Sequence, residues 1–506
     1  MAFINSFISW LMKKRIHQIE LFMKYPHEVQ LEWFRKLMSS ASDTEWGVKY
    51  DYSSILTPEQ FKERVPVNDY NSLKPYIERL RHGEQNLLWN SEIKWFAKSS
   101  GTTNDKSKFI PVSQEALEEC HFKGGKDLLS IYLHNNPDSQ LFDGKGLALG
   151  GSHKISEFNN DSYYGDLSAI IIQNLPFWAE FSRVPTRKIA LLDEWETKIE
   201  QMARATIEDD VTSLSGVPSW TLLLLKRILE ITEKTDISEV WPNLELYFHG
   251  GVSFTPYREQ FKSIIHSPKM NYVETYNATE GFFGIQDSPE RNDMLLMLDY
   301  GVYYEFLPME HIGDEHPATL TLEQVELDKN YALVISTNGG LWRYLIGDTV
   351  RFTCLSPYRI QITGRTKTFI NAFGEELIEE NARQALAVAC EKTGAIVNEY
   401  TAAPVFIEKG KQACHEWIVE FERMPENKGF FIETLDNALK SLNSDYEAKR
   451  YKNILLKEPI VHFALPMTFY NWMKKRNKLG GQNKVPRLSN DRKYVEEILL
   501  CMMQKH

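Results

Sequence analysis

Three short strand candidates in the middle of the chain end in polar or glycine-containing turns, and they restrict the fold more than any other feature. They cover residues 246–248, 272–276 and 331–336, and the first stops at the turn His249-Gly250-Gly251. The stretch at 222–229 is apolar over a longer distance and suits a buried helix. Strands and helices that alternate in this way are typical of an α/β core with largely buried strands.

The character of the sequence changes near residue 365. An alternating strand follows at 417–421, and amphipathic helices follow at 431–442 and 495–502. A chain of 506 residues is also too long for one compact core. We therefore predict a large N-terminal α/β domain over residues 1–364 and a smaller C-terminal α+β domain over residues 365–506.

Composition narrows the class of ligand. The formal net charge of -11 argues against nucleic-acid binding, which relies on a basic surface, but leaves room for a small anionic ligand. The five cysteines are scattered and form no CxxC pair, which is typical of a reduced intracellular protein without a zinc site. No apolar run is long enough to cross a bilayer. We expect a cytoplasmic protein that acts on small molecules and has no integral membrane association.

A polar segment rich in small residues runs from Ser99 to Lys108 and reads SSGTTNDKSK. Successive small residues let backbone N–H groups turn toward an anion, and the hydroxyl and lysine side chains add donors and charge. The GxxxxGK[ST] spacing of a Walker loop is absent. The residues alone leave two interpretations open, a phosphate-binding loop and a solvated polar turn.

The segment SSGTT, followed by lysines and by FIPVS, resembles the phosphate loop of the firefly-luciferase-like adenylate-forming superfamily. The closest resemblance is to the auxin-responsive acyl-acid amido synthetases, a family known from plants and bacteria. It implies a large N-terminal domain with an adenylate-forming core, followed by a small domain. It also implies that ATP phosphates contact the loop, for which the candidates are Ser99, Ser100, Gly101, Thr102, Thr103 and Lys108. Asp105 departs from this motif, because glycine usually occupies its position.

Two further segments resemble motifs of the same family. In YNATEG, the resemblance implies that Tyr276 stacks on adenine, that Thr279 borders the nucleotide, and that Glu280 binds the Mg²⁺ that bridges ATP phosphates. In GLWRYLIGD, it implies that Asp348 accepts hydrogen bonds from the ribose hydroxyls. Leu345 departs from this second motif, in which many members have arginine. From the residues alone, YNATEG also fits a strand-to-turn junction with an exposed glutamate.

Two segments resemble the mobile parts of the superfamily. The resemblance of ITGRTK to the hinge implies that Arg365 reaches the ribose and that a mobile C-terminal domain follows. The glycine-flanked Lys484 resembles the lysine that reaches the attacking carboxylate and the α-phosphate during adenylation. A surface turn with two solvated cations is the alternative interpretation of the segment ITGRTK.

Weaker matches complete the expected site. The turn at Gly250 and Gly251 resembles a loop that borders the adenine, and the segment with Val217 and Trp220 resembles a lining of the acyl pocket. An ordinary helix entry with a core tryptophan explains the second segment equally well.

Together these motifs predict an ATP-dependent ligase with Lys484 and Glu280 as catalytic residues and Mg²⁺ as cofactor. It would adenylate a small carboxylic acid, release pyrophosphate, and transfer the acyl group to an amino acid amine with release of AMP. Two alternatives stay open: transfer to a thiol such as coenzyme A, and nucleotide binding without turnover. The departures at Asp105 and Leu345 leave the second alternative open, whereas Glu280, Asp348 and Lys484 argue against it.

Overall fold

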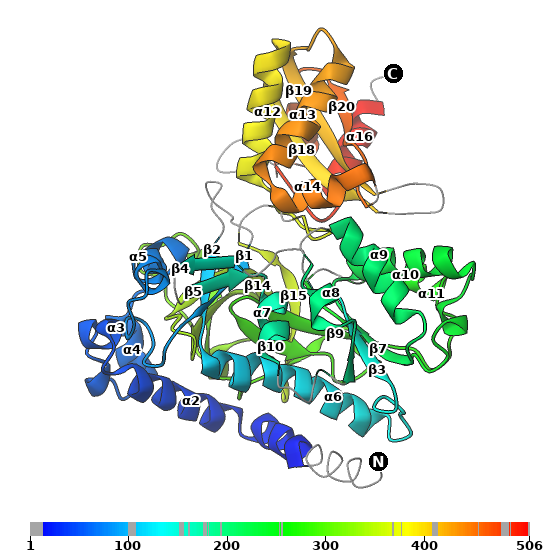
Figure 1. Cartoon of the computed structure of the whole chain (residues 1–506). Helices are drawn as coiled ribbons and strands as arrows, with labels where there is room; N and C mark the ends of the chain where they lie inside the picture. The colour runs from blue at the N-terminus through cyan, green and yellow to red at the C-terminus, as the bar shows by residue number, and fades with distance from the viewer. Residues whose placement is uncertain are drawn as a thin grey trace. The chain divides into compact units, whose positions relative to one another are not determined.

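A mixed sheet of 11 strands forms the centre of the larger part of the protein in the computed structural model of the chain (Figure 1). Its strand order is β12-β13-β14-β15-β11-β10-β9-β8-β7-β3-β6. The strands are β3 (Lys145–Ala148), β6 (Arg183–Val184), β7 (Val211–Ser215), β8 (Leu246–His249), β9 (Asn271–Ala278), β10 (Gly281–Ile285), β11 (Met294–Leu296), β12 (Val302–Pro308), β13 (Asn330–Thr337), β14 (Tyr344–Leu355) and β15 (Tyr358–Arg365). Neighbours from β6 to β9 pair in parallel, and all other neighbours pair antiparallel.

The structure describes residues 14–99, 108–150, 156–159, 162–175, 180, 182–192, 195–251, 254, 257–366, 369–375, 377–406, 413–453, 455–476, 485 and 487–503. They divide into two compact units: described residues up to Thr366 form the first, and those from 369 onward form the second. The change of unit comes two residues after the boundary predicted from sequence. The functional roles assigned to the two domains stay predictions.

A second sheet of the first unit holds the strands that flank the predicted phosphate loop. Its order is β2-β1-β5-β4, with β1 (Trp95–Ser99), β2 (Lys108–Val112), β4 (Ser156–Asn159) and β5 (Ser162–Gly165). The main helices of this unit are α2 (Pro26–Ala41), α4 (Pro58–Arg64), α5 (Tyr70–Arg81), α6 (Lys123–Asn135), α7 (Leu167–Asn174), α9 (Trp195–Thr206), α10 (Pro218–Thr232) and α11 (Arg258–Lys262). A π-helical turn, Ala116–Phe122, leads into α6.

Burial explains why several strands of the large sheet consist of successive apolar residues. All five residues of β10 are buried, as are six of seven in β12 and seven of eight in β13. A strand covered on both faces carries apolar residues at successive positions and does not alternate. The predicted strands at 246–248, 272–276 and 331–336 are thus confirmed as β8, β9 and β13, and the helix at 222–229 as α10.

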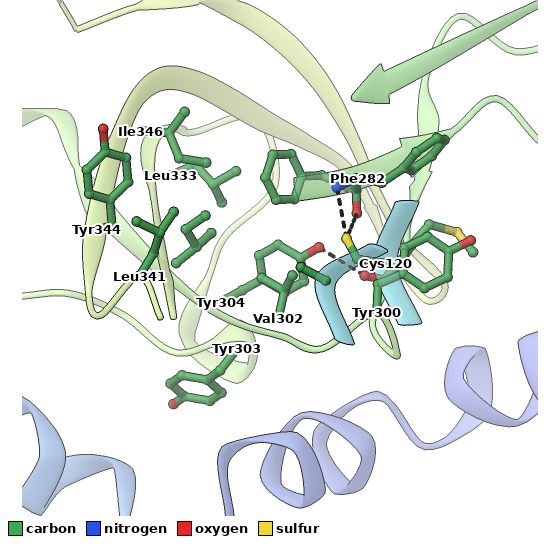
Figure 2. Close-up of a cluster of buried hydrophobic side chains, with 14 of the residues drawn as sticks. Cys120, Phe282, Tyr300, Val302, Tyr303, Tyr304, Leu333, Leu341, Tyr344 and Ile346 are labelled. Carbon is green, nitrogen blue, oxygen red and sulfur yellow. Dashed lines mark hydrogen bonds between the residues drawn. The ribbon is translucent and has the colours of Figure 1, made fainter. Parts of the chain in front are cut away.

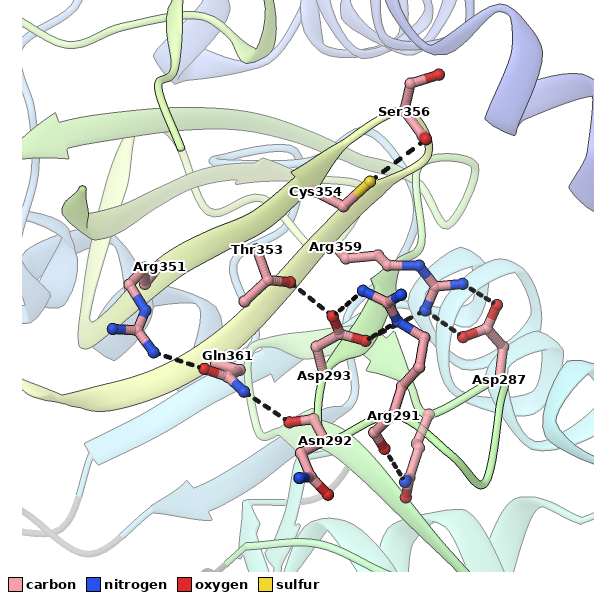
Figure 3. Close-up of polar contacts among 11 residues, drawn as sticks. Asp287, Arg291, Asn292, Asp293, Arg351, Thr353, Cys354, Ser356, Arg359 and Gln361 are labelled. Carbon is pink, nitrogen blue, oxygen red and sulfur yellow. Dashed lines mark hydrogen bonds and ion pairs between the residues drawn. The ribbon is translucent and has the colours of Figure 1, made fainter. Parts of the chain in front are cut away.

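Polar contacts join the loop between β10 and β11 to β15 (Figure 3). The Arg359 guanidinium donates to both oxygens of Asp287, at 2.6 and 2.7 Å, and to Asp293 at 3.3 Å. Arg291 donates to both oxygens of Asp293, at 2.8 and 2.6 Å. Bidentate pairs of this kind set the relative position of the chain segments that carry them.

The second unit contains a three-stranded sheet with helices on both faces. Its strands follow the order β18-β19-β20, with β18 (Ile396–Val405), β19 (Cys414–Arg423) and β20 (Ile460–Ala464). Its helices are α12 (Glu379–Thr393), α13 (Lys428–Leu442), α14 (Ser444–Arg450), α15 (Thr468–Lys475) and α16 (Lys493–Met503), and a small hairpin joins β16 (Phe369–Ile370) to β17 (Leu377–Ile378). Ile418 packs in one cluster with residues of α15 and α16, whereas Phe421 contacts Phe431 of α13. Alternation along β19 sends these two side chains to opposite faces.

The fold is therefore the predicted one, a large mixed α/β part followed by a smaller α+β part. None of the helices that the structure describes is both long and apolar enough to span a membrane.

Candidate active site

The carboxyl ends of the parallel strands β3, β7, β8 and β9 lie along one edge of the large sheet. Ser213, Leu214 and Ser215 of β7 stand beside the first three residues of β8, and His249 at the end of β8 stands beside Glu274 of β9. In open α/β sheets, ligands bind in the crevice outside these carboxyl ends. The turns that leave β7 and β8 carry several of the predicted site residues.

The turn Gly250–Gly251 after β8 is one of them. A Cβ atom at Gly250 would lie 2.6 Å from the carbonyl oxygen of Thr275, and Gly251 has a φ of +82° that favours glycine. The Thr275 hydroxyl also donates to the His249 carbonyl at 3.0 Å. The turn therefore packs closely on β9, one residue before Tyr276.

Val217 lies beside this turn. A Cβ atom at Gly251 would lie 3.6 Å from Cγ2 of Val217. Val217 is the N-cap of α10, and Trp220 stands half-buried in the first turn of that helix. The structure thus brings the predicted adenine loop and the predicted acyl segment together, although they come from different parts of the sequence.

Tyr276 and Asp348 make the most direct contact between two predicted motifs. The Tyr276 hydroxyl donates a 2.7 Å hydrogen bond to Oδ2 of Asp348, and both side chains are buried. Tyr276 belongs to β9 and Asp348 to β14, so the contact joins the parallel and antiparallel parts of the sheet. The predicted adenine and ribose residues therefore share one location.

Arg365 ends β15 directly opposite Asp348 of β14 in the strand register. The amide of Thr366 donates to the carbonyl of Gly347 at 2.7 Å, and Gly347 has a φ of +101°. The backbone of the predicted hinge thus begins next to the predicted ribose residue. The Arg365 side chain lies outside what the structure describes.

Glu280 lies in the two-residue turn between β9 and β10, which the pair Ala278 and Gly281 closes. Thr279 donates through its hydroxyl to Oε2 of Glu280 at 2.6 Å. Within the described ranges, no group of three or more His, Cys, Asp or Glu side chains could hold a metal ion. A single carboxylate nevertheless fits Mg²⁺, because this ion binds through one or two carboxylates and takes its other ligands from substrate phosphates and water.

Of the predicted phosphate loop, the structure describes only the two ends. Ser99 at the end of β1 pairs with Lys108 at the start of β2, and the Lys108 ammonium lies 6.0 Å from the centroid of the Tyr70 ring. The candidates Ser100, Gly101, Thr102 and Thr103 lie outside the described residues, as do Asp105 and Lys484.

Arg343 and Leu345, the two neighbours of Tyr344 in the GLWRYLIGD motif, make contacts that indicate structural roles. Arg343 is 3% exposed and donates to both carboxylate oxygens of Glu305, which is 0% exposed, and to the carbonyl of Val65. Leu345 packs beside the small apolar cluster of Leu307, Ala332 and Val334. The departure from arginine at Leu345 is thus accommodated by apolar packing.

Cys120 and His121 contact the β9–β10 hairpin, and the sequence analysis missed both. They lie in the π-helical turn just after β2. In the sequence they are neighbours in the segment ALEECHF, which is only a weak signal of a shared role. Apolar periodicity distinguishes a helix from a strand but does not reveal a wider helical turn.

A mixed sheet of this topology, with Tyr276 bonded to Asp348 and the Gly250–Gly251 turn packed next to Tyr276, is the fold of the adenylate-forming class of enzyme. Solved structures of that class share the fold. The GH3.15 acyl acid amido synthetase in complex with 2,4-DB aligns with a TM-score of 0.63 at 17% identity, over 97% of this chain and 96% of that chain. A 2-hydroxyisobutyryl-CoA ligase aligns with a TM-score of 0.59 at 12% identity, over 96% and 93%.

Sequence comparison gives the family. The GH3 family N-terminal domain matches residues 15–270, the central domain 295–365 and the C-terminal domain 380–493, and the chain belongs to the GH3 family. An indole-3-acetic acid-amido synthetase of Arabidopsis thaliana is 24% identical over 77% of this chain and 76% of its own length. A jasmonoyl--L-amino acid synthetase of Nicotiana attenuata is 23% identical over 66% and 68%. The protein is an AMP-forming acid–amino acid ligase that uses ATP, as predicted.

Proposed function

We propose that this ligase joins a small aromatic or aliphatic carboxylic acid to the amine of an amino acid. The observation that carries the proposal is the hydrogen bond between Tyr276 and Asp348, beside the Gly250–Gly251 turn at the carboxyl edge of the sheet. Relatives that act on indole-3-acetic acid and on jasmonate support a carboxylic acid substrate. The half-buried Trp220 and the neighbouring Val217 are the proposed acyl contacts.

The reaction proceeds in two steps. In the first, a carboxylate oxygen attacks the α-phosphorus of ATP, an acyl–phosphate bond forms, and pyrophosphate leaves. In the second, the amine nitrogen attacks the activated carbonyl carbon, the amide bond forms, AMP leaves with the electron pair, and the amine gives up a proton. The first step depends chiefly on charge neutralisation and orientation.

The nucleotide is held by groups from three strands in this proposal. The Tyr276 ring offers a face for adenine, and the carboxylate of Asp348 offers acceptor oxygens to the ribose hydroxyls. The bond from Tyr276 fixes the orientation of that carboxylate before ATP arrives. Arg365, directly opposite Asp348 in the strand register, adds a donor.

Glu280 is the proposed ligand of Mg²⁺, and a bound ion would neutralise phosphate charge. The Thr279 hydroxyl orients the Glu280 carboxylate through its 2.6 Å hydrogen bond. We expect Glu280→Gln to abolish carboxylate-dependent pyrophosphate exchange and to leave the melting temperature unchanged. Glu290→Gln, the same change at an exposed position after β10, is the matched control. Equal exchange in the two variants would contradict the metal role.

The proposed phosphate contacts lie at the ends of β1 and β2 and in the segment of sequence between them: Ser99, Ser100, Gly101, Thr102, Thr103 and Lys108. Lys484 is the proposed cation for the attacking carboxylate and the α-phosphate. We expect Lys484→Ala to slow adenylation far more than acyl transfer from a preformed adenylate. We further propose that the C-terminal domain is mobile and brings Lys484 to the substrates for adenylation only. Equal losses in the two steps would contradict both roles.

The acid and the acceptor can be identified together. Wild-type protein is assayed for pyrophosphate exchange over a panel of carboxylic acids, and amides are then detected by mass in an amino acid mixture. AMP release is measured separately with amines and with thiols. No exchange with any acid would support nucleotide binding without turnover, and AMP release with thiols alone would support a coenzyme A ligase. We further propose that the enzyme works in the cytoplasm, which fractionation of the native cell tests.

A further inference from the structure

The turn that carries Glu280 rests against a rare backbone element. Residues Ala116–Phe122 form a π-helical turn, whose hydrogen bonds run from i to i+5. Such turns are wider than an α-helix, in which consecutive side chains point about 100° apart. The wider turn brings the side chains of Cys120 and His121 closer in direction than an α-helix would.

Both side chains reach the β9–β10 hairpin (Figure 2 shows Cys120). Cys120 Sγ accepts a hydrogen bond from the amide of Phe282 at 3.1 Å and contacts the Phe282 carbonyl oxygen at 3.9 Å. The side chain of His121 lies close to that of Asn277. Burial lowers the pKa of His121 to about 4, so the ring is neutral at pH 7.

These two contacts fall on one cross-strand pair. Asn277 of β9 is the register partner of Phe282 of β10, and the next pair, Ala278 and Gly281, closes the turn that holds Glu280. The register shifts between Phe282 and Gly284, so this part of the hairpin is irregular. The bond from the Phe282 amide to Cys120 holds the backbone at that irregularity.

Helix α6 supports the same hairpin through close packing. A Cβ atom at Gly124 would lie 2.6 to 3.0 Å from three atoms of the Phe282 ring. A Cβ atom at the adjacent Gly125 would have no heavy atom within 4 Å. Gly124 is therefore required for the ring to sit against the helix, whereas Gly125 is not.

We propose that Cys120, His121 and Gly124 are positioning residues that hold the turn of Glu280 for binding of Mg²⁺ with ATP. This inference rests on the proposed function of Glu280. A metal ligand depends on the residues that orient it, and loss of an outer contact typically lowers metal affinity by about 10- to 100-fold. Here the orientation acts through the backbone of the hairpin, because neither side chain touches the carboxylate itself in the described contacts.

The two neighbouring glycines provide a matched test. Gly124→Ala and Gly125→Ala raise helix propensity by the same amount. Any difference in behaviour between the two variants therefore comes from the steric contact of the methyl group added in Gly124→Ala with the Phe282 ring. We expect Gly124→Ala to raise the Mg²⁺ concentration for half-maximal ATP binding, measured by calorimetry, by about 10-fold. Gly125→Ala should match wild type, and both should keep the wild-type KM for the acid.

Hydrogen exchange gives a readout that does not depend on activity. Without nucleotide, amides of residues 276–284 should exchange faster in Gly124→Ala and in Cys120→Ala than in Gly125→Ala. Cys120→Ser retains a group that accepts a hydrogen bond and should restore slow exchange and Mg²⁺ affinity in part.

The outcomes separate the two proposals. If wild-type protein binds ATP but Gly124→Ala and Gly125→Ala behave alike, the positioning role is wrong while the function stands. Faster exchange in Gly124→Ala with an unchanged Mg²⁺ dependence also overturns the positioning role. Wild-type protein that binds no ATP overturns the proposed function and this inference together.

Discussion

The hydroxyl of Tyr276 donates a hydrogen bond to the carboxylate of Asp348 over 2.7 Å, and the two residues lie 72 positions apart in the chain. Tyr276 is 4% exposed and Asp348 is 8% exposed, so water competes little for either partner. A hydrogen bond to a charged group contributes about 1.5–3 kcal/mol. The pair therefore has a defined geometry before any ligand binds.

This pair makes a direct prediction for nucleotide binding. Tyr276→Phe keeps the ring but removes the donor, so we expect the KM for ATP to rise about 10-fold with little change in the KM for the acid. Asp348→Ala should also remove discrimination between ATP and 2′-deoxyATP, measured by pyrophosphate exchange. Retained discrimination in Asp348→Ala would contradict the ribose role.

Gly250 gives a second prediction. Gly250→Ala would place a methyl group 2.6 Å from the Thr275 carbonyl and displace β9 next to Tyr276. Overpacking of this kind costs about 1–3 kcal/mol, and we expect much of it to appear as weaker ATP binding in calorimetry. Gly125→Ala serves as a control, since its added methyl group meets nothing within 4 Å. ATP affinity equal to that of the control would argue against a nucleotide role for this turn.

The buried ion pair of Arg343 with Glu305 leads to a prediction about the free energy of unfolding. Arg343→Met would leave the fully buried Glu305 without its cation, and breaking such a pair typically costs about 3–5 kcal/mol. We expect a matching loss in the free energy of unfolding, measured with urea. Arg343→Met combined with Glu305→Gln should recover part of the loss, because no buried charge then remains. If Arg343→Met alone were as stable as wild type, the ion pair would not contribute to stability.

The ion pair of Asp293 with Arg291 leads to a prediction about how the stability of the fold depends on pH. Hydrogen bonding from Arg291 lowers the pKa of Asp293 to about 2 (Figure 3). Its ionised form therefore stabilises the fold above the unfolded pKa of about 3.9, and this contribution is lost as the pH falls toward about 2. Asp293→Asn should cost about 1–2 kcal/mol at pH 7 and progressively less between pH 4 and pH 2. The free energy of unfolding is measured with urea at each pH. Asp138→Asn, the same change at an exposed position, is the control.

Much of the fold could be predicted from local patterns in the sequence. The predicted strands became β8, β9 and β13, and in β8 and β13 successive residues are apolar because most of them are buried. The motifs and their order also indicated an adenylate-forming enzyme, because they resemble those of a known family. These features are local, so neighbouring residues alone carry the signal.

Contacts between distant residues were decided only by the tertiary structure. The apposition of Tyr276 and Asp348 depends on how β9 and β14 enter one sheet through the strands between them. Arg343 turns inward to Glu305, although its motif does not distinguish a nucleotide contact from a buried ion pair. The contact between the π-helical turn and the Glu280 hairpin joins Cys120 and Phe282, which are 162 positions apart.

The sequence by itself therefore determined the class of fold, the enzyme family and the residue types of the site, because burial patterns and motifs are written in short stretches. The tertiary structure decided which of those residues meet and what holds them. Side-chain packing and hydrogen-bond pairing form between segments far apart in the chain, so local sequence does not specify them.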